Sequence, residues 1–263
     1  MPELPEVATF KKYLDGTSLH QKINEVIVHD DKIIRNMSGD DFCAGMMDRS
    51  LTNSYRRGKY LFARLDNGYS LLLHFGMTGD LNYYHQQEDQ TKHERFHFRF
   101  DNGAMLGFDC PRKFARILLL EDEEAYIRSI KLGEDALTIA EESFINAAIN
   151  RKCTIKGLLL NQKILAGVGN LYADEVCYQC RVHPASPSSS IPTKKLKELH
   201  STLQTILHQA VEQQAHYKEY PDDWFWSWRK DDALHPKTNE IIERAKIAGR
   251  TSYYFPEYQV LYV

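Results

Sequence analysis

Two copies of one turn sequence in the first half of the chain restrict its fold more than any other feature. Asp66-Asn67-Gly68 and Asp101-Asn102-Gly103 each lie between segments with the composition of β-strands. Asparagine and glycine accept the positive φ angles of tight turns, so such triplets between β-rich segments favour hairpins. Hairpins join antiparallel neighbours, and residues 23–28, 60–65 and 69–75 add further strand patterns. We therefore expect an antiparallel β-sandwich within residues 1–125.

The pattern becomes helical in the second half of the chain. Residues 141–149, 155–160 and 171–180 have helical character, and Gly167-Val168-Gly169-Asn170 interrupts the helical pattern before the last of them. Thr193 is expected to cap a long amphipathic helix. The apolar side of that helix consists of Leu196, Leu199, Leu203, Ile206, Ala210 and Val211.

Two changes of composition divide the chain. The acidic residues 121–124 precede the helical part, and an aromatic segment begins at Tyr220. A length of 263 residues is enough for two or three modules, each with its own core. We predict an α+β chain with an N-terminal helix and β-sandwich in residues 1–125, a helical domain in 126–220 and a C-terminal module in 221–263.

The first six residues, Met1-Pro2-Glu3-Leu4-Pro5-Glu6, could carry chemistry. Small second residues generally permit removal of the initiator methionine, which would leave Pro2 as a secondary amine. An α-amino group has a pKa of about 7.7–8.0, against about 10.4 for lysine, so part of it is nucleophilic near neutral pH. Attack of this amine on a sugar-type carbon would form an iminium, and Glu3 could transfer the protons that the reaction needs.

The same residues could instead only start a helix. Proline is favoured at the first helical position, and Val7, Phe10 and Leu14 would then share one face before Gly16 ends the helix. The two interpretations are compatible, because carboxylates near a helix N-terminus are electrostatically favoured.

The charge of the chain does not by itself indicate a nucleic-acid partner, since the formal net charge is −3. Basic residues nevertheless gather in four clusters, and a local basic surface is enough to bind DNA. The clusters are Arg56, Arg57 and Lys59; Arg112, Lys113 and Arg116; Arg151, Lys152 and Lys156; and Arg244, Lys246 and Arg250. The sequence contains no long apolar run, so we expect neither a membrane span nor a signal peptide. Five cysteines, an odd number, indicate reduced thiols and a cytoplasmic protein.

Taken together, the motifs resemble one known family. The start of the chain, residues 1–7, is similar to that of the formamidopyrimidine-DNA glycosylase and endonuclease VIII family, and five more motifs follow in the family's order. They are Arg57-Gly58-Lys59-Tyr60, His74-Phe75-Gly76-Met77-Thr78-Gly79, Pro111-Arg112-Lys113-Phe114, Gly167-Val168-Gly169-Asn170 and Gly249-Arg250-Thr251. The resemblance implies a helix and β-sandwich, a helix–two-turn–helix domain and a C-terminal finger hairpin.

The resemblance also implies a reaction on damaged bases in double-stranded DNA, with the base extruded from the stack. Pro2 would attack the sugar carbon, Glu3 would protonate the ring oxygen and Glu6 would order the site. β- and then δ-elimination would break the strand on both sides. Lys59 and Arg250 correspond to residues that contact the phosphate of the lesion.

Further residues correspond to DNA contacts of the family. Met77, Arg112 and Phe114 would fill the gap that the extruded nucleotide leaves, which offsets the lost stacking. Backbone contacts, which position DNA without reading its sequence, correspond to Arg95, Lys113, Arg151, Lys156 and Asn170. A monomer would suffice for this binding.

No cofactor or metal is expected. The four ligand positions of the family's zinc finger correspond to His235, Thr238, Phe255 and Tyr258. Only His235 could bind zinc, and one ligand cannot form a tetrahedral site. We therefore predict a zincless hairpin that is held by packing of Phe255 against Tyr258 and Ile247. Cys177 and Cys180 have the spacing of half a metal or redox site but lack a second pair, so we expect them in a helix core.

Three departures from the family and two alternative functions stay open. Cys110 and Asn161 stand where aspartate is common in relatives, and Arg95 stands where histidine is common. We expect ring-opened formamidopyrimidines as the preferred substrate, then 8-oxoguanine, then oxidised pyrimidines. The alternatives are a catalytically silent protein that binds damaged DNA and an endonuclease VIII-like enzyme that prefers oxidised pyrimidines.

Overall fold

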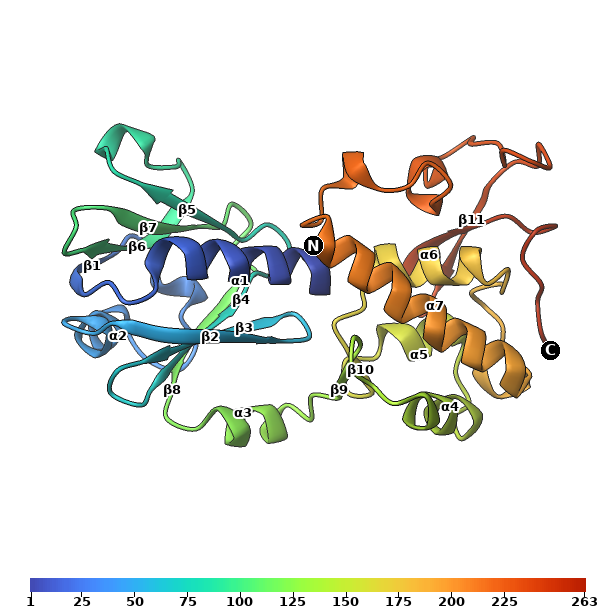
Figure 1. Cartoon of the computed structure of the whole chain (residues 1–263), viewed down its shortest axis with the longest axis horizontal. Helices are drawn as coiled ribbons and strands as arrows, with labels where there is room; N and C mark the ends of the chain where they lie inside the picture. Colours follow the sequence, from blue (N-terminus) through green and yellow to red (C-terminus); the bar gives the residue numbers. More distant parts are fainter. The chain divides into compact units, whose positions relative to one another are not determined.

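The computed structural model describes residues 1–263, and these form two compact units, Met1–Ile130 and Lys131–Val263 (Figure 1). No helix in either unit has the length and apolar composition that a membrane crossing requires.

The first unit is a helix on a β-sandwich, as predicted from the paired turns. Its two four-stranded sheets have the orders β1-β6-β7-β5 and β2-β3-β4-β8, and every pairing is antiparallel. Its helices are α1 (Leu4–Ser18), α2 (Gly39–Met46) and α3 (Glu123–Ser129), with 3₁₀ turns η1 (Asp31–Ile33) and η2 (Gln87–Asp89). Its strands are β1 (Ile23–Val28), β2 (Leu51–Arg57), β3 (Tyr60–Leu65), β4 (Ser70–His74), β5 (Asp80–Tyr84), β6 (Glu94–Phe100), β7 (Met105–Asp109) and β8 (Arg116–Leu120).

Both predicted hairpins are present, joining β3 to β4 and β6 to β7. The glycine of each Asp-Asn-Gly triplet has a positive φ, +89° at Gly68 and +83° at Gly103. In each loop the asparagine side chain accepts a hydrogen bond from the backbone N–H two residues on, from Tyr69 in one and Ala104 in the other. The shared sequence therefore forms one turn geometry twice.

Helix α1 packs its apolar face on the sandwich, with Val7 and Leu14 fully buried. The ring of Phe10 stacks on Phe75 with centroids 4.1 Å apart. The prediction that Gly16 ends this helix is wrong, because the helix continues to Ser18. No atom lies within 4 Å of a Cβ built at Gly16, so no close contact requires glycine there. Ser18 is buried and holds the last helical turn against the protein. This packing outweighs the low helix propensity of glycine and sets the C-terminus of the helix.

The second unit is mainly helical and ends in a β-hairpin. The four helices that the sequence predicted are α4 (Glu141–Ile149), α5 (Ile155–Leu160), α6 (Asn170–Gln179) and α7 (Thr193–Glu212). The unit also contains two short strands, β9 (Glu134–Asp135) and β10 (Leu165–Ala166). The 3₁₀ turns are η3 (Ser188–Ser190), η4 (Tyr217–Glu219) and η5 (Phe225–Trp228), and the hairpin is β11 (Glu243–Ile247) with β12 (Arg250–Tyr254). Helix α7 begins at Thr193, but its N-cap position is occupied by Pro192.

An aromatic cluster holds the C-terminal segment on α6. Tyr178 of α6 stacks on Phe225 at 4.8 Å and lies near Phe255, Trp228 and Tyr258. His235 lies between the rings of Phe255 and Tyr258, at centroid distances of 4.8 and 4.3 Å. Phe225 and Phe255 are thus fully buried in the core of this unit, whereas Trp226 is exposed. Cys177 and Cys180 are also buried, and burial raises the pKa of the Cys180 thiol to about 11.

Candidate functional site

The start of α1 fixes the two carboxylates of the N-terminal motif. Glu3 is the N-cap and Glu6 is the third helical residue, and the pair forms a capping box in which the Glu3 N–H donates to Glu6 Oε2 at 2.8 Å. Pro5 in the first turn supplies the fixed φ that a helix start favours. Glu3 is only 4% exposed, whereas Pro2 is partly exposed directly before it. The helical interpretation of the motif is thus confirmed.

Lys59 lies in the tight turn between β2 and β3. Arg57 pairs with Tyr60, so the turn contains only Gly58, with φ of +57°, and Lys59. Glycine at the first of two loop positions is the requirement of a type II′ hairpin. The turn and the start of α1 lie at the same end of the first unit in Figure 1. Lys59 is buried, with 7% of its surface exposed.

His74 lies beside Lys59 and is neutral. Burial, followed by the positive charges of Arg116 and Lys59, lowers the pKa of His74 to about 4. Its Nδ1 accepts the N–H of Gly76 at 3.3 Å, which assigns the proton of the neutral ring to Nε2. An uncharged ring at the end of β4 thus orders the loop that follows without adding another cation beside Lys59.

The two loops that carry the predicted gap-filling residues are packed backbone against backbone. A Cβ built at Gly76 would lie 2.4 Å from the carbonyl carbon of Phe114, and Gly76 has a φ of +62°. The Arg112 N–H donates to Thr78 Oγ1 at 3.3 Å. Three exposed side chains emerge from this joint: Met77 (37% exposed), Phe114 (53% exposed) and Arg112, whose guanidinium lies 5.2 Å above the Phe114 ring. The structure thus brings together two loops whose contacting residues are 34 or more positions apart in the sequence.

Arg95 and Lys113 share one acidic partner, Asp30. The Lys113 ammonium contacts Asp30 Oδ2, and Arg95 Nη1 lies 3.5 Å from the same oxygen. The hydrogen bond from Lys113 is the main reason that the pKa of Asp30 is lowered, and it outweighs burial, which raises this pKa. Arg95 Nε also donates to the carbonyl of Cys110 at 2.8 Å, and Cys110 itself is fully buried. Cys110, one of the departures from the family, therefore occupies a core position in this chain.

In the second unit, the glycine-rich motif forms the start of α6. Gly167 has a φ of +116° and its N–H donates to Gln162 Oε1 at 3.0 Å. Gly169 is the N-cap, and the Asn170 side chain donates from Nδ2 to the carbonyl of Thr251 at 2.9 Å. Asn170 therefore connects the helix start to the β11–β12 turn, where Arg250 is exposed after the left-handed pair Ala248 and Gly249.

Lys156 is not placed for direct phosphate contact. Its side chain is completely buried, and its ammonium donates to Asp174 Oδ1 and Ser252 Oγ, each at 2.5 Å. Arg229 also pairs with Asp174, because its Nε and Nη2 both lie 2.9 Å from Asp174 Oδ2. Burial lowers the pKa of Lys156, and Asp174 opposes this effect. We reinterpret Lys156 as a positioning residue that joins α5 to β12. Arg151, by contrast, is exposed and donates only to Ala147 within this unit.

Sequence reasoning missed the buried acids of α6. Glu175 is 1% exposed and accepts the N–H groups of Phe225 at 2.9 Å and Trp226 at 3.1 Å. Burial raises the pKa of Glu175 to about 7. An acidic pair in the middle of an otherwise apolar helix, Asp174-Glu175, was the available signal, because buried carboxylates require partners. The two acids connect α6 to the aromatic segment and to the hairpin.

Two solved structures of proteins bound to DNA share the fold of this chain. A MutM structure in complex with DNA containing carbocyclic 8-oxo-G superposes with a TM-score of 0.89 at 23% identity, covering 98% of this chain and 99% of that one. The Lactococcus lactis Fpg (MutM) bound to DNA containing N7-benzyl-Fapy-dG gives 0.88 at 24% identity, with 98% and 99% covered.

Sequence comparison identifies the family. Residues 1–117 match the formamidopyrimidine-DNA glycosylase N-terminal domain, and residues 132–220 match the formamidopyrimidine-DNA glycosylase H2TH domain. The chain is 32% identical to a formamidopyrimidine-DNA glycosylase of Arabidopsis thaliana over 100% of this chain and 72% of that protein. It is 31% identical to one of Pelotomaculum thermopropionicum, with 98% and 99% covered. The chain belongs to the formamidopyrimidine-DNA glycosylase family, and is thus a DNA glycosylase of base excision repair.

Proposed function

We propose that this glycosylase removes oxidised bases through a Schiff base on Pro2 and then cleaves the strand by β,δ-elimination. The observation that carries the proposal is the capping box at the start of α1. It holds the Glu3 carboxylate in a buried, fixed position directly beside Pro2. A proton donor held within one residue of an amine nucleophile is what this reaction requires.

In the proposed reaction, the Pro2 nitrogen forms a bond to the sugar carbon as the bond from that carbon to the damaged base breaks. The base leaves with the electron pair and takes up a proton. Glu3 then protonates the ring oxygen, so the ring opens and an iminium joins Pro2 to the sugar. The iminium acidifies the adjacent C–H, and successive loss of the two phosphate groups breaks the strand. Water finally hydrolyses the iminium.

The exposed triad of Met77, Arg112 and Phe114 is proposed to enter the DNA stack. Insertion of an apolar side chain between base steps offsets part of the lost stacking when a nucleotide is extruded. The stacked Arg112 and Phe114 side chains would present one rigid face, because their loop is fixed against that of Met77. Arg250, Lys59, Asn170 and Arg151 are proposed to bind phosphates, and Arg95 and Lys113 to support this with charges that Asp30 partly neutralises.

Ring-opened formamidopyrimidines are the proposed preferred substrates, with 8-oxoguanine second and oxidised pyrimidines third. The relatives support the first of these substrates, because similar curated proteins are named formamidopyrimidine-DNA glycosylases. Single-turnover excision from duplexes that carry each lesion opposite cytosine or guanine would rank them. Excision confined to oxidised pyrimidines would overturn the order and leave the amine mechanism unaffected.

Borohydride trapping on an abasic duplex tests the mechanism. Borohydride reduces an iminium to a stable amine, so we expect a covalent protein–DNA product with the wild-type chain, and intact mass should show that the trapped protein lacks Met1. Pro2→Gly should weaken trapping, whereas Lys32→Ala, which removes an exposed lysine of the same unit, should not. Full trapping of protein that retains Met1, or no trapping at all, would reject the proposal.

A further inference from the structure

A cluster of two histidines and one glutamate lies in the first unit, outside every position assigned above. The side chains are His29, which follows β1, and Glu94 and His97 of β6. One donor atom from each lies within 4.8 Å of the donor atoms of the other two. Glu94 Oε1 lies 3.3 Å from His29 Nε2 and 2.7 Å from His97 Nδ1.

A β-bulge brings the three side chains to one face of the sheet. Glu94 pairs with Asp109 and Phe96 with Phe108, so two steps along β6 correspond to one step along β7. In a regular strand, residues three apart point to opposite faces, but one extra residue reverses the alternation. Glu94 and His97 therefore point to the same side, opposite to Phe96. His29 shares that side, because Val28 pairs with Phe96.

Gly107 leaves the space that the glutamate occupies. A Cβ built at Gly107 would lie 2.0 Å from Glu94 Oε2, so any other residue there would displace the carboxylate. Tyr84 donates to that oxygen at 2.9 Å. Glu94 is 5% exposed and His97 is 1% exposed, and the second ring nitrogen of His97, Nε2, is buried without a hydrogen-bond partner. Two buried donors, the Glu94 carboxylate and the His97 ring, are thus held together inside the sandwich.

In contrast to the expectation from the sequence that no metal is bound, we propose that His29, Glu94 and His97 bind a divalent transition metal such as Zn²⁺. The ion would stabilise the first unit and take no part in the DNA reaction. Two imidazoles and a carboxylate are ligands that zinc accepts. In a tetrahedral site with bonds of about 2.0–2.1 Å, two donors lie about 3.3 Å apart, which the His29–Glu94 separation already matches. His97 and Glu94 need to separate by about half an ångström as the metal replaces the proton between them.

The same geometry shows how an ion could enter and which side chain borders its fourth coordination position. The His29 side chain is 37% exposed, so an ion can enter from solvent on that side. Gln90 Nε2 lies 2.9 Å from both His29 Nε2 and Glu94 Oε1, so this amide borders the fourth coordination position. The ion would connect β1 to β6 and to the connection between β5 and β6. Pro2 and Glu3 are not members of the cluster, so a structural role is assigned.

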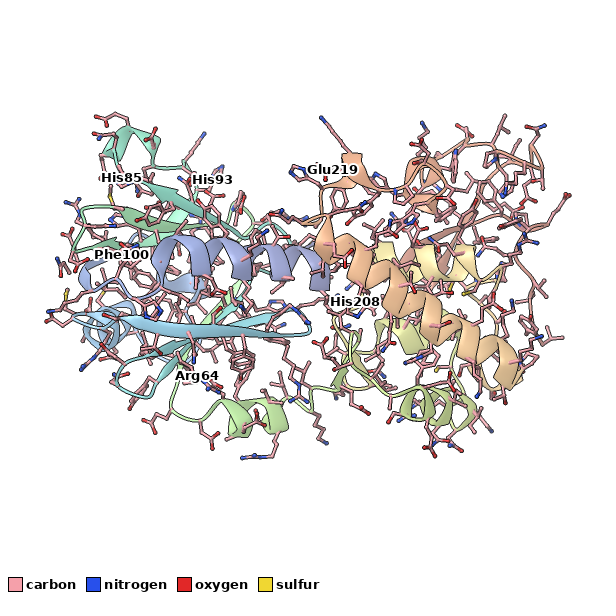
Figure 2. The ribbon with its side chains drawn as sticks, viewed as in Figure 1. Arg64, His85, His93, Phe100, His208 and Glu219 are labelled. Carbon is pink, nitrogen blue, oxygen red and sulfur yellow. The ribbon has the colours of Figure 1, made fainter.

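The test uses the full chain, stripped of metal and titrated with zinc chloride and, in parallel, cobalt chloride. We expect one Zn²⁺ per chain after dialysis, a higher melting temperature with zinc, and visible Co²⁺ absorption of a nitrogen- and oxygen-ligated site. His29→Ala and Glu94→Gln should each weaken binding at least tenfold. His85→Ala and His208→Ala, which remove exposed histidines labelled in Figure 2, should not.

The outcomes separate a metal site from a polar network. Glu94→Gln keeps the size of the side chain and an acceptor for Tyr84, so its folding is checked by the melting temperature without metal. No zinc binding by the wild-type chain, or equal binding by wild type and both cluster variants, would overturn the proposal. Strand cleavage should be equal in stripped and zinc-loaded protein, and a loss of cleavage on stripping would overturn the assigned structural role.

Discussion

At the residue scale, Glu3 combines two tasks that usually belong to different side chains. It caps α1, and we propose that it also transfers the proton that opens the sugar ring. Both tasks need a fixed position, because a cap accepts backbone N–H groups and an acid must reach one atom of the substrate. The capping box with Glu6 supplies that position from within six residues of sequence.

The two tasks can be separated by Glu3→Gln. Glutamine keeps an oxygen for the helix cap but cannot donate the proton, so we expect base excision to fall by roughly 10²–10⁴-fold while DNA affinity stays within a few-fold of wild type. Single-turnover excision and binding to an uncleavable abasic analogue measure the two effects. Excision within a few-fold of wild type would show that Glu3 only caps the helix.

At the element scale, the joint between the β4–β5 loop and the β7–β8 loop should depend on Gly76. Gly76→Ala places a methyl group against the Phe114 backbone at a φ of +62°, so we expect at least ~1–3 kcal/mol of destabilisation, together with weaker binding to an abasic duplex. Gly68→Ala is the matched control, because its φ is +89° but its Cβ meets nothing within 4 Å. Urea unfolding and DNA titration measure both, and equal effects of the two variants would contradict the joint.

The docking of the aromatic segment on α6 should depend on pH through Glu175. Its pKa in the folded chain is raised from 4.5 to about 7, so its contribution to stability is complete below the unfolded pKa and is lost as pH rises through about 7. The shift corresponds to roughly 3 kcal/mol between pH 4.5 and 7. Thermal melts across this window should show a decline in wild type that is smaller in Glu175→Gln. Parallel curves for the two proteins would refute the assignment.

Element boundaries and hairpins followed closely from the sequence, because Asn-Gly turns and helical periodicity are local signals. The site depended on contacts that no local pattern contains. Lys156 belongs to a basic cluster that predicted a DNA contact. In the structure its side chain is buried, and its ammonium group donates to Asp174 and Ser252. Likewise, the bulge before Phe96 brings Glu94 and His97 to one face although their spacing predicts opposite faces. Long-range packing decided each of these cases.

At the scale of the whole molecule, binding to duplex DNA should weaken steeply with salt although the net charge is −3. Each phosphate contact releases counterions and contributes about −0.9 to the slope of log K against log salt. Arg250→Ala should therefore reduce the slope by about 1. Arg128→Ala, on the exposed side of α3, removes an arginine outside the proposed interface and should leave the slope unchanged. A flat salt dependence for wild type would contradict the phosphate contacts.

The close approach of Gly76 to the Phe114 backbone has a consequence for chimeric enzymes. Neither loop has room to change its course while the other stays fixed, since a single added carbon already meets main-chain atoms. Exchange of one loop with that of a relative should therefore misplace Met77 or Phe114, even where the transferred segment has the same length. Residues 75–79 and 111–115 therefore form one structural unit. A chimera that is designed to change lesion preference at this end of the sandwich should exchange both loops together.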